Sequence, residues 1–534
     1  MRARAPIDTL SYELFDQILL YLSSPVEYGP PAKPNYLCLE STFPSTPNKC
    51  RGLAQYAAVS KKWKQAVERF TFNTIQVSSG NLPRLSNNMS HFNRRYSLRN
   101  LFCTIQLLSY SQNRRSNFER RREHQANLDA FRQALTLLFK AVESYHNYNG
   151  ASRELRLAIT ADAPVNPPDK DESERRVRSN LGDLRWSYPE HTLTLSDDRK
   201  EPPDLGRLIN VSHLSIAKTG RRIHPFAIRQ MVYALPTLRK LDIRIPPVQA
   251  KNKDLRASMR NDLARVLEMC ALEQLEYLSI EMEDSTPRNH TFAIASAIDN
   301  DYPAGDHLGR AVCKLMQTSL RELYMGPEVL ISPVLFGVDP RHPERATKSF
   351  PYLTKMQVMY SLVTYDGRWY YDGDADPDGL DWDMPPGDSD NDSDSNSSFN
   401  SEYSDWVNEE REEYLHGNRP YYTYRTLPGG LFNDLIGALV SAVPRMSSLC
   451  ALEVRTNNPG ENEYETGVEY VAPGYQAQST KGNPKYETEG ILAKKRWVLS
   501  FGYNAGWDIP PGIWEMMLDQ VGYHEGQGQI IQVP

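Results

Sequence analysis

The sequence predicts an α/β protein in which amphipathic helices alternate with short strands. A six-residue pattern, apolar-x-x-apolar-x-apolar, recurs six times between residues 211 and 454. Apolar residues at helical spacing precede several copies, which is typical of repeated helix–strand units. A chain of 534 residues also exceeds what one hydrophobic core usually serves. We therefore expect two or more structural units.

The first predicted helix covers residues 10–22. Ser11 can cap its start, and Glu13 lies in the first turn, where the helix dipole favours negative charge. One stripe of this helix is apolar and consists of Leu10, Leu14, Ile18 and Leu22.

A second apolar stripe follows at helical spacing, after a Pro-rich insertion at 23–51. It consists of Tyr56, Val59, Trp63 and Val67. The alternating residues 70–77 then predict a strand.

These two helices resemble an F-box. The family pattern is Leu-Pro-x-Glu-(Leu/Ile)-x-x-x-Ile-Leu-x-x-Leu, followed by a Val-(Cys/Ser)-(Lys/Arg)-x-Trp helix. Ser11 stands where the family usually has proline, and residues 23–51 separate the two halves. The resemblance covers residues 1–75 and implies docking on the Skp adaptor of SCF-type ubiquitin ligases. It assigns partner binding to Leu10, Leu14, Ile18, Leu22, Val59 and Trp63; an ordinary helical hairpin is the alternative.

Residues 128–142 predict a further helix, and residues 155–159 a short strand. The six repeated patterns then begin at Val211, Leu238, Leu275, Leu320, Leu353 and Leu449. They resemble leucine-rich repeats, whose strands line one surface. Successive copies start 27, 37, 45, 33 and 96 residues apart, against about 20–29 in regular repeats. The resemblance implies an irregular β–α solenoid over 76–365 and 426–534, and a non-repetitive α/β domain is the alternative.

The longest gap between copies contains an acidic stretch. Residues 366–425 are rich in Asp and Ser, cannot bury enough apolar surface to fold, and are expected to form a disordered insertion. Further on, residues 496–501 predict a strand and residues 511–521 a helix. We expect this C-terminal part to cap the solenoid.

Alternation along the repeat strands predicts which side chains are available to a substrate. The positions between the buried apolar residues are Lys240 and Asp242, Tyr277 and Ser279, Glu322 and Tyr324, and Lys355 and Gln357. Among them, Tyr277, Tyr324, Lys240 and Lys355 are the candidate substrate-binding residues, with the tyrosines as anchors.

Composition and motifs argue against several classes of function. A net charge of −6 argues against dominant nucleic-acid binding. The six cysteines contain no CxxC pair, which is typical of reduced thiols in the cytosol or nucleus. No signal peptide or apolar run of membrane length is visible. No phosphate-binding loop, HExxH metal pair or nucleophile elbow is present, so we expect no catalytic residue, metal or cofactor.

An arginine cluster between residues 94 and 122 leaves three alternatives open: a solvated loop, a site for an acidic partner or nuclear import, or a nucleic-acid contact. For the whole chain, the resemblance implies an intracellular F-box protein of the kind common in filamentous fungi. Such a protein would recruit a protein substrate to a cullin ligase without catalysing ubiquitin transfer. The alternative is an F-box or repeat scaffold that acts outside ubiquitination.

Overall fold

A computed structural model describes most of the predicted helices and strands. The described residues are 11, 14–15, 17–19, 53–111, 119–145, 154–162, 165–166, 192–195, 204–217, 221–245, 253–269, 272–282, 305–338, 349–373, 427–456, 466–481, 483–486, 488–501 and 507–533. The Pro-rich insertion at 23–51 and the acidic stretch from residue 374 to 425 lie outside them, as do Leu10 and Leu22.

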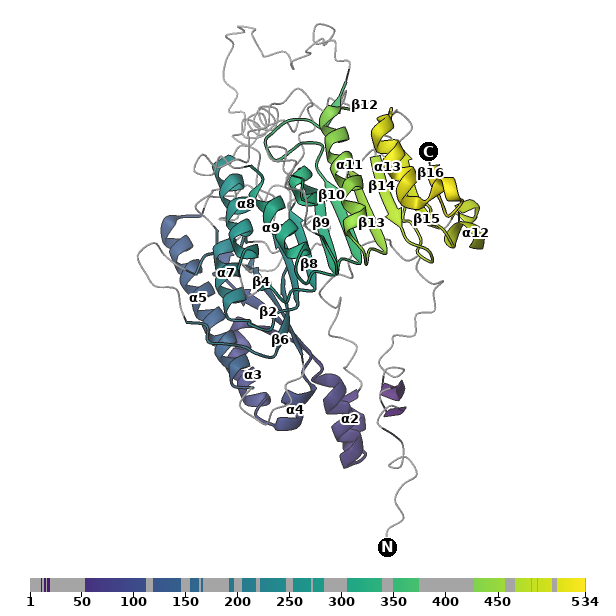
Figure 1. Cartoon of the computed structure of the whole chain (residues 1–534). Helices are drawn as coiled ribbons and strands as arrows, with labels where there is room; N and C mark the ends of the chain where they lie inside the picture. Colours follow the sequence, from purple (N-terminus) through teal and green to yellow (C-terminus); the bar gives the residue numbers. More distant parts are fainter. Residues whose placement is uncertain are drawn as a thin grey trace, which may run out of the picture. The chain divides into compact units, whose positions relative to one another are not determined.

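The chain divides into two compact units. The first comprises Met1–Pro246 and Arg265–Ile280, and the second comprises Pro247–Ala264 and Glu281–Pro534. This division does not coincide with the predicted boundaries near residues 75, 365 and 425, which stay predictions. In both units helices accompany strands that are mostly parallel (Figure 1), so the α/β class is confirmed.

The first unit orders its main strands β1-β2-β4-β6-β7-β8. The neighbouring pairs from β1 to β7 are all parallel. Two neighbouring parallel strands require a crossover connection that brings the chain back to the edge where the first strand began. Helix α5 lies in the connection between β2 and β4, and α7 in the connection between β6 and β7. The strands are β1 (Thr74–Ser78), β2 (Asn100–Gln106), β4 (Leu155–Asp162), β6 (Val211–Ile216), β7 (Lys240–Ile245) and β8 (Tyr277–Met282), and the short β3 (Tyr110–Ser111) pairs with β5 (Val165–Asn166).

Helices α5 and α7 lie on the same side of these strands in Figure 1. Helix α5 (Arg121–Glu143) contains the helix predicted at 128–142 and buries Phe131, Leu135 and Leu138. Helix α7 (Pro225–Tyr233) begins with proline at a position where no backbone donor is needed. The other helices of this unit are α2 (Lys61–Thr71), α3 (Leu82–Asn88) and α4 (Phe92–Ser97), with the 3₁₀ turns η3 (Leu53–Ala58) and η4 (Ser79–Asn81).

The strand predicted at 70–77 starts later than expected. Helix α2 continues to Thr71, and Phe70 packs against the apolar cluster of the N-terminal helices. The Phe72 amide closes the helix by donating to the Glu68 carbonyl at 2.8 Å. The apolar alternation of residues 70–72 therefore belongs to a helix end, and only β1 is extended.

The second unit orders its strands β9-β10-β13-β14-β15-β16. The pairs β9/β10, β10/β13 and β15/β16 are parallel, whereas β14 is antiparallel to both β13 and β15. The strands are β9 (Glu322–Val329), β10 (Lys355–Tyr360), β13 (Ala451–Thr456), β14 (Thr466–Val471), β15 (Lys495–Phe501) and β16 (Gly528–Val533). The sequence did not predict β14 or β16, while β15 confirms the strand at 496–501.

Helices α9 (His307–Met316), α11 (Gly430–Ala442) and α13 (Pro511–Val521) lie on one side of the second unit's strands in Figure 1. Helix α13 confirms the prediction at 511–521. Helix α8 (Lys253–Leu267) also matches a predicted stripe, and its Met259, Leu263 and Val266 are fully buried. The remaining elements are α12 (Glu489–Leu492), η9 (Pro333–Phe336), η11 (Val443–Arg445), η13 (Pro484–Tyr486) and η14 (Tyr523–Glu525).

The ordered fold of the second unit continues into the predicted acidic insertion. Strand β11 (Tyr371–Asp372) pairs with β12 (Leu427–Pro428). Tyr370 and Tyr371 are buried; Tyr370 donates to the Ile331 carbonyl at 2.8 Å, and the Tyr371 hydroxyl lies 3.0 Å from that of Tyr360. The predicted start of the insertion at residue 366 is therefore too early, because these aromatic residues belong to the core.

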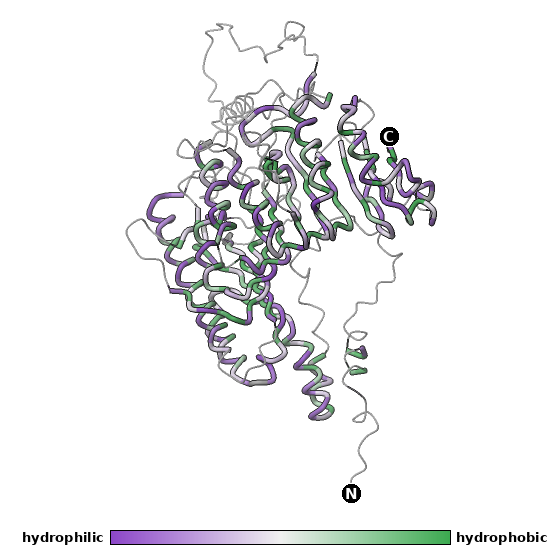
Figure 2. The backbone as a smooth tube through the Cα atoms, viewed as in Figure 1, coloured by the Kyte–Doolittle hydropathy of each residue, from purple (hydrophilic) through white to green (hydrophobic). Residues whose placement is uncertain are grey.

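All six repeated patterns contain a strand. In five of them the first apolar residue, such as Leu238 or Leu353, lies just before the strand and is still fully buried. Figure 2 shows hydrophobic residues along the strands and alternating hydrophobic and hydrophilic residues along the helices. Among the helices of the described residues, none combines the length and apolar character that crossing a membrane requires.

Candidate functional site

The N-terminal helices pack around one tryptophan. The Trp63 side chain is 4% exposed, and its ring meets that of Phe15 edge-on at 5.0 Å and stacks on Tyr56 at 5.8 Å. Leu19, Leu53, Ala66 and Val67 complete this cluster. Aromatic contacts of this kind add to the stabilisation from apolar burial. Trp63, one of the predicted partner-binding residues, therefore holds the two helices together rather than presenting its ring to solvent.

Serine caps start both helices. The Leu14 amide donates to the Ser11 hydroxyl, and the Trp63 amide donates to the Ser60 hydroxyl, each at 3.3 Å. Each serine satisfies a backbone donor that has no partner inside its helix. The predicted capping role of Ser11 is confirmed, and this contact fixes where the first helix begins.

Other predicted partner-binding residues stay accessible. The Leu14 side chain is 46% exposed and Val59 is 59% exposed, while Ile18 is half-buried against the Trp63 cluster. The buried residues of the first helix are Phe15 and Leu19. Each follows directly after a residue of the predicted stripe, Leu14 or Ile18. The helices thus have their own core and still expose large aliphatic side chains, which is the composition of a docking surface.

Part of the arginine cluster connects these helices to the rest of the first unit. The Arg94 guanidinium lies 2.8 Å from the Glu68 carboxylate on α2 and 4.8 Å from the centre of the Phe72 ring. Arg95 lies over the Tyr145 ring at 5.7 Å. These arginines therefore stabilise the packing of α4 against α2 and against the residues that follow α5. Arg120, Arg121 and Arg122 are exposed at the start of α5, whereas Arg114 and Arg115 lie outside the described residues.

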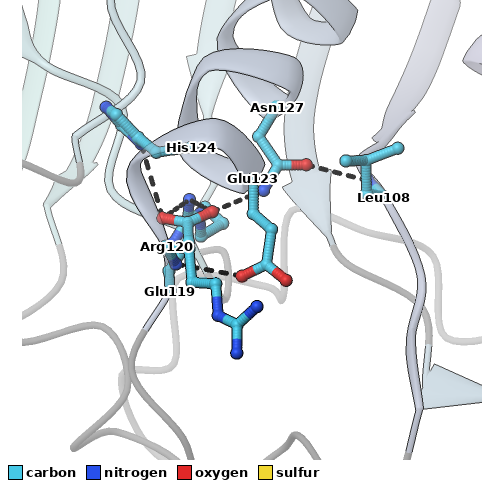
Figure 3. Close-up of polar contacts among 7 residues, drawn as sticks. Leu108, Glu119, Arg120, Glu123, His124 and Asn127 are labelled. Carbon is cyan, nitrogen blue, oxygen red and sulfur yellow. Dashed lines mark hydrogen bonds and ion pairs between the residues drawn. The ribbon is translucent and has the colours of Figure 1, made fainter.

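A buried carboxylate near the start of α5 gathers several polar groups (Figure 3). Glu119 accepts from the Arg221 guanidinium at 2.5 Å and from the Asn127 amide at 2.6 Å, and His124 Nδ1 lies 3.4 Å away. Both carboxylate oxygens already contact Arg221. A carboxylate held in this way is a structural ion-pair centre rather than a base that can accept a substrate proton. Arg221 lies 102 positions from Glu119 in the sequence, so no sequence motif indicates this pair.

The first unit's strands carry a polar face opposite their apolar one. Side chains alternate along each strand, and the register aligns Arg156, His213 and Lys240 across β4, β6 and β7. We call these three residues the basic row. Lys240, a predicted substrate-binding residue, is exposed, whereas Arg156 and His213 are half-buried.

A second row on this face is buried, contrary to expectation. Ser215 and Asp242 are register partners, and the Ser215 hydroxyl donates to the Asp242 carboxylate at 3.0 Å. Asp242 is 4% exposed and Ser279 fully buried, although both were expected to face a substrate. The short side chains of Ser215 and Ser279 are fully covered by their neighbours. Arg244 lies beside Asp242, with its Nε 3.9 Å from Asp242 Oδ1.

Burial also changes the titration of this face. It raises the pKa of Asp242, although Arg244 and the Ser215 hydrogen bond act in the opposite direction. Burial, together with the charges of Arg156 and Lys240, lowers the pKa of His213 to about 3. His213 is therefore neutral at pH 7 and lies in a positive potential.

The second unit places the other predicted substrate-binding residues on neighbouring strands. Lys355 is exposed, Tyr324 is half-buried, and Gln357 lies between Tyr324 and Glu453 in the register. Tyr277 of β8 is also half-buried. The polar face of this unit is largely satisfied internally, because Glu453 accepts from Gln357 at 2.9 Å and pairs with Arg455 at 3.1 Å.

The residues predicted from the sequence to contact a substrate do not include Arg156 and His213 of the basic row. His213 occupies the same place in its repeated pattern as Lys240 and Tyr277, so alignment of the copies could have identified it. Among the described residues, no group of His, Cys, Asp or Glu side chains is arranged to hold a metal ion. A comparison with protein-family models finds no match to this chain, and a comparison with curated proteins finds none.

Proposed function

We propose that this chain is the substrate-recognition subunit of an SCF-type ubiquitin ligase. Its N-terminal helices would bind the Skp-type adaptor, and through it the cullin, in the manner of an F-box. The supporting observation is the division of roles within these helices: Phe15 and Trp63 form their core, while Leu14 and Val59 stay exposed. Both exposed side chains are therefore accessible to a partner.

The strands that follow would present the substrate. An irregular, leucine-rich-repeat-like arrangement is supported by the order of β6, β7 and β8, in which each strand has its chain predecessor as neighbour. Parallel β9, β10 and β13 repeat the pattern in the second unit. Stacked units of this kind bury one strand face beneath helices and offer the other to partners. Lys240, Tyr277, Tyr324 and Lys355 are the proposed substrate contacts.

Ubiquitin transfer would be carried out by other subunits. The contribution of this chain is proximity, since holding a substrate lysine near the charged conjugating enzyme raises its effective concentration. This role needs no catalytic group on the chain, and the buried Glu119 and Asp242 carboxylates serve the fold. The intracellular location, in the cytosol or nucleus, is part of the same proposal.

Substitution of the exposed aliphatic residues tests the docking role. Leu14→Ala combined with Ile18→Ala should weaken co-purification of the adaptor with the full chain at least about tenfold, because apolar anchors at an interface centre typically contribute about 2 kcal/mol or more. Leu137→Ala is the matched control, since Leu137 of α5 is similarly exposed, at 42%, outside the N-terminal helices. Unchanged adaptor recovery with the double variant would refute the docking role.

Turnover of bound proteins distinguishes a ligase subunit from a scaffold. The expected substrates are proteins that accumulate on the chain that lacks residues 1–75, or on the full chain when the proteasome is inhibited. An adaptor complex that forms without changing the lifetime of any bound protein would favour the scaffold alternative.

A further inference from the structure

The basic row combines three groups with spacing set by the sheet. Arg156, His213 and Lys240 are consecutive register partners on parallel strands, and neighbouring strands lie about 4.8 Å apart. The outer two side chains therefore start about 10 Å apart on the same face. The row therefore offers hydrogen-bond donors from a guanidinium, an imidazole and an ammonium group, and it contains no carboxylate.

The charges around the row leave it positive. The buried carboxylate of Asp242 has Arg244 beside it, and its burial raises its pKa although Arg244 and Arg156 act in the opposite direction. Arg239, just before β7, lies 3.6 Å from Glu154 and 3.9 Å from Glu276, so it is balanced by its own neighbours. Lys240 is exposed and forms no ion pair with any residue that the structure describes. Burial is the main cause of the lowered pKa of His213, and the charges of Arg156 and Lys240 lower it further.

His213 adds a polar atom that lacks a protein partner. Its Nε2 is buried and makes no hydrogen bond within the described part of the chain. Because the ring is neutral at pH 7, Nε2 can carry a proton and donate it to an acceptor oxygen. A buried polar atom without a partner is costly, and a ligand oxygen between Arg156 and Lys240 would satisfy it.

These features define the ligand chemistry. Arginine binds carboxylate or phosphate oxygens through two parallel N–H bonds, and lysine acts as a point charge on a flexible stem. In an extended peptide, alternate side chains lie about 7 Å apart on the same side, so two acidic residues can reach the row together. The row is only three residues wide, which suits two or three acidic side chains, and the net charge of −6 argues against dominant nucleic-acid binding.

We infer that the basic row binds an extended acidic segment of the protein substrate, with carboxylate or phosphoserine side chains between Arg156 and Lys240. This inference rests on the proposed function, because it names the class of substrate that the strand face would recruit. It also adds Arg156 and His213 to the substrate contacts predicted from the sequence.

Direct titration of the full chain with labelled peptides tests the inference. The probes are a ten-residue glutamate peptide, a Gly/Ser peptide with two phosphoserines and a ten-residue glutamine peptide. The acidic peptides should bind and the glutamine peptide should not; comparing the two acidic peptides shows whether carboxylate or phosphate is preferred. The same titrations in a chain with residues 374–416 replaced by a Gly/Ser linker remove the chain's own acidic stretch as a competitor.

One pair of matched variants locates the site. Lys240→Glu should weaken acidic-peptide binding at least about tenfold, since it removes one charge-assisted contact and adds repulsion. Lys495→Glu is the control, because Lys495 is also exposed and also begins a strand, but on β15 in the second unit and outside the proposed substrate contacts. It should change binding less than twofold. His213→Phe should weaken binding without changing the positive charge of the row, because the His213 ring is neutral at pH 7.

Two results would overturn the inference: equal effects of Lys240→Glu and Lys495→Glu, or tighter binding of a 20-nucleotide single-stranded DNA that Lys240→Glu abolishes. Adaptor binding measured on the same samples keeps the two proposals separate. Peptide binding without adaptor binding refutes the ligase function but not the site, and adaptor binding without peptide binding refutes the site alone.

Discussion

The polar strand faces of the two units differ in how their charges are satisfied. In the first unit, Lys240 has no ion-pair partner among the described residues and His213 Nε2 has no hydrogen bond there. In the second unit, Glu469 is buried and accepts the amides of Gln478 and Ser479 at 2.6 and 2.9 Å. Polar residues on such strand faces can therefore serve either recognition or the stability of the fold. Whether a polar residue is available to a partner protein depends more on its hydrogen-bond and ion-pair partners than on its residue type.

The largest expected effect concerns the internally satisfied face. Glu469→Ala should lower the free energy of unfolding by about 3 kcal/mol, because it leaves two amides without their charged acceptor. Chemical denaturation of the full chain, followed by tryptophan fluorescence, measures the change. Glu322→Ala, which removes an exposed carboxylate of β9, should change stability by less than about 0.5 kcal/mol. Equal losses in these two variants would contradict the assignment of Glu469 to the fold.

A smaller effect should come from His213. Its pKa in the folded chain, about 3, lies below the unfolded value near 6.5, so the unfolded state takes up the proton first. The stability associated with neutral His213 is therefore complete above pH 6.5 and is lost as pH falls toward 3. Between pH 7 and pH 4 the wild type should lose about 2 kcal/mol more than His213→Gln, after allowance for partial solvent exposure. Parallel stability curves for the two proteins would show that His213 is not buried in a positive potential.

Asp242 should show the opposite pH dependence. Burial raises its folded-state pKa above the unfolded value near 3.9, so the folded state holds the proton more tightly. Stability then falls as pH rises through the window between the two values. Asp242→Asn removes this loss and should gain stability relative to the wild type between pH 3 and pH 7. A variant that becomes relatively less stable at pH 7 would mean that the charged carboxylate is needed, for example by Arg244.

The smallest effect is expected for the acidic stretch. Replacing residues 374–416 with a short Gly/Ser linker should leave the melting temperature nearly unchanged, because loop-closure entropy changes by only about 0.6 kcal/mol per doubling of length. The replacement must begin after residue 373, since Tyr370 and Tyr371 are buried. A large loss of stability would show that this stretch packs on the second unit.

Local patterns predicted most elements of the fold. Apolar periodicity located α5, α13 and the six repeat strands, because one buried face dictates the spacing of residues such as Leu241 and Ile243. Apolar periodicity did not predict strands whose position depends on pairing with strands distant in the sequence. The antiparallel β14 depends on pairing with β13 and β15, and no local signal sets that direction.

The candidate sites were predictable to a lesser degree. Alternation correctly placed Lys240 and Lys355 at exposed positions, but it assigned the same exposure to Asp242, which is buried by its neighbours. Likewise, the sequence predicted the apolar stripe that contains Leu14. It did not predict that the neighbouring Phe15 and Leu19 are the buried residues of this helix. A sequence pattern shows which side chains share a face, but only packing shows which of two apolar faces is covered.

The most direct test of the account is the affinity of the purified Skp-type adaptor for the full chain and for its Val59→Asp variant. Val59 is 59% exposed, so a charge there should leave folding intact while placing an unpaired carboxylate in the proposed interface. The account predicts that the adaptor binds the wild type and Leu137→Asp with equal affinity and Val59→Asp at least about tenfold more weakly. Absence of adaptor binding to the wild type, or equal binding to all three proteins, would contradict it.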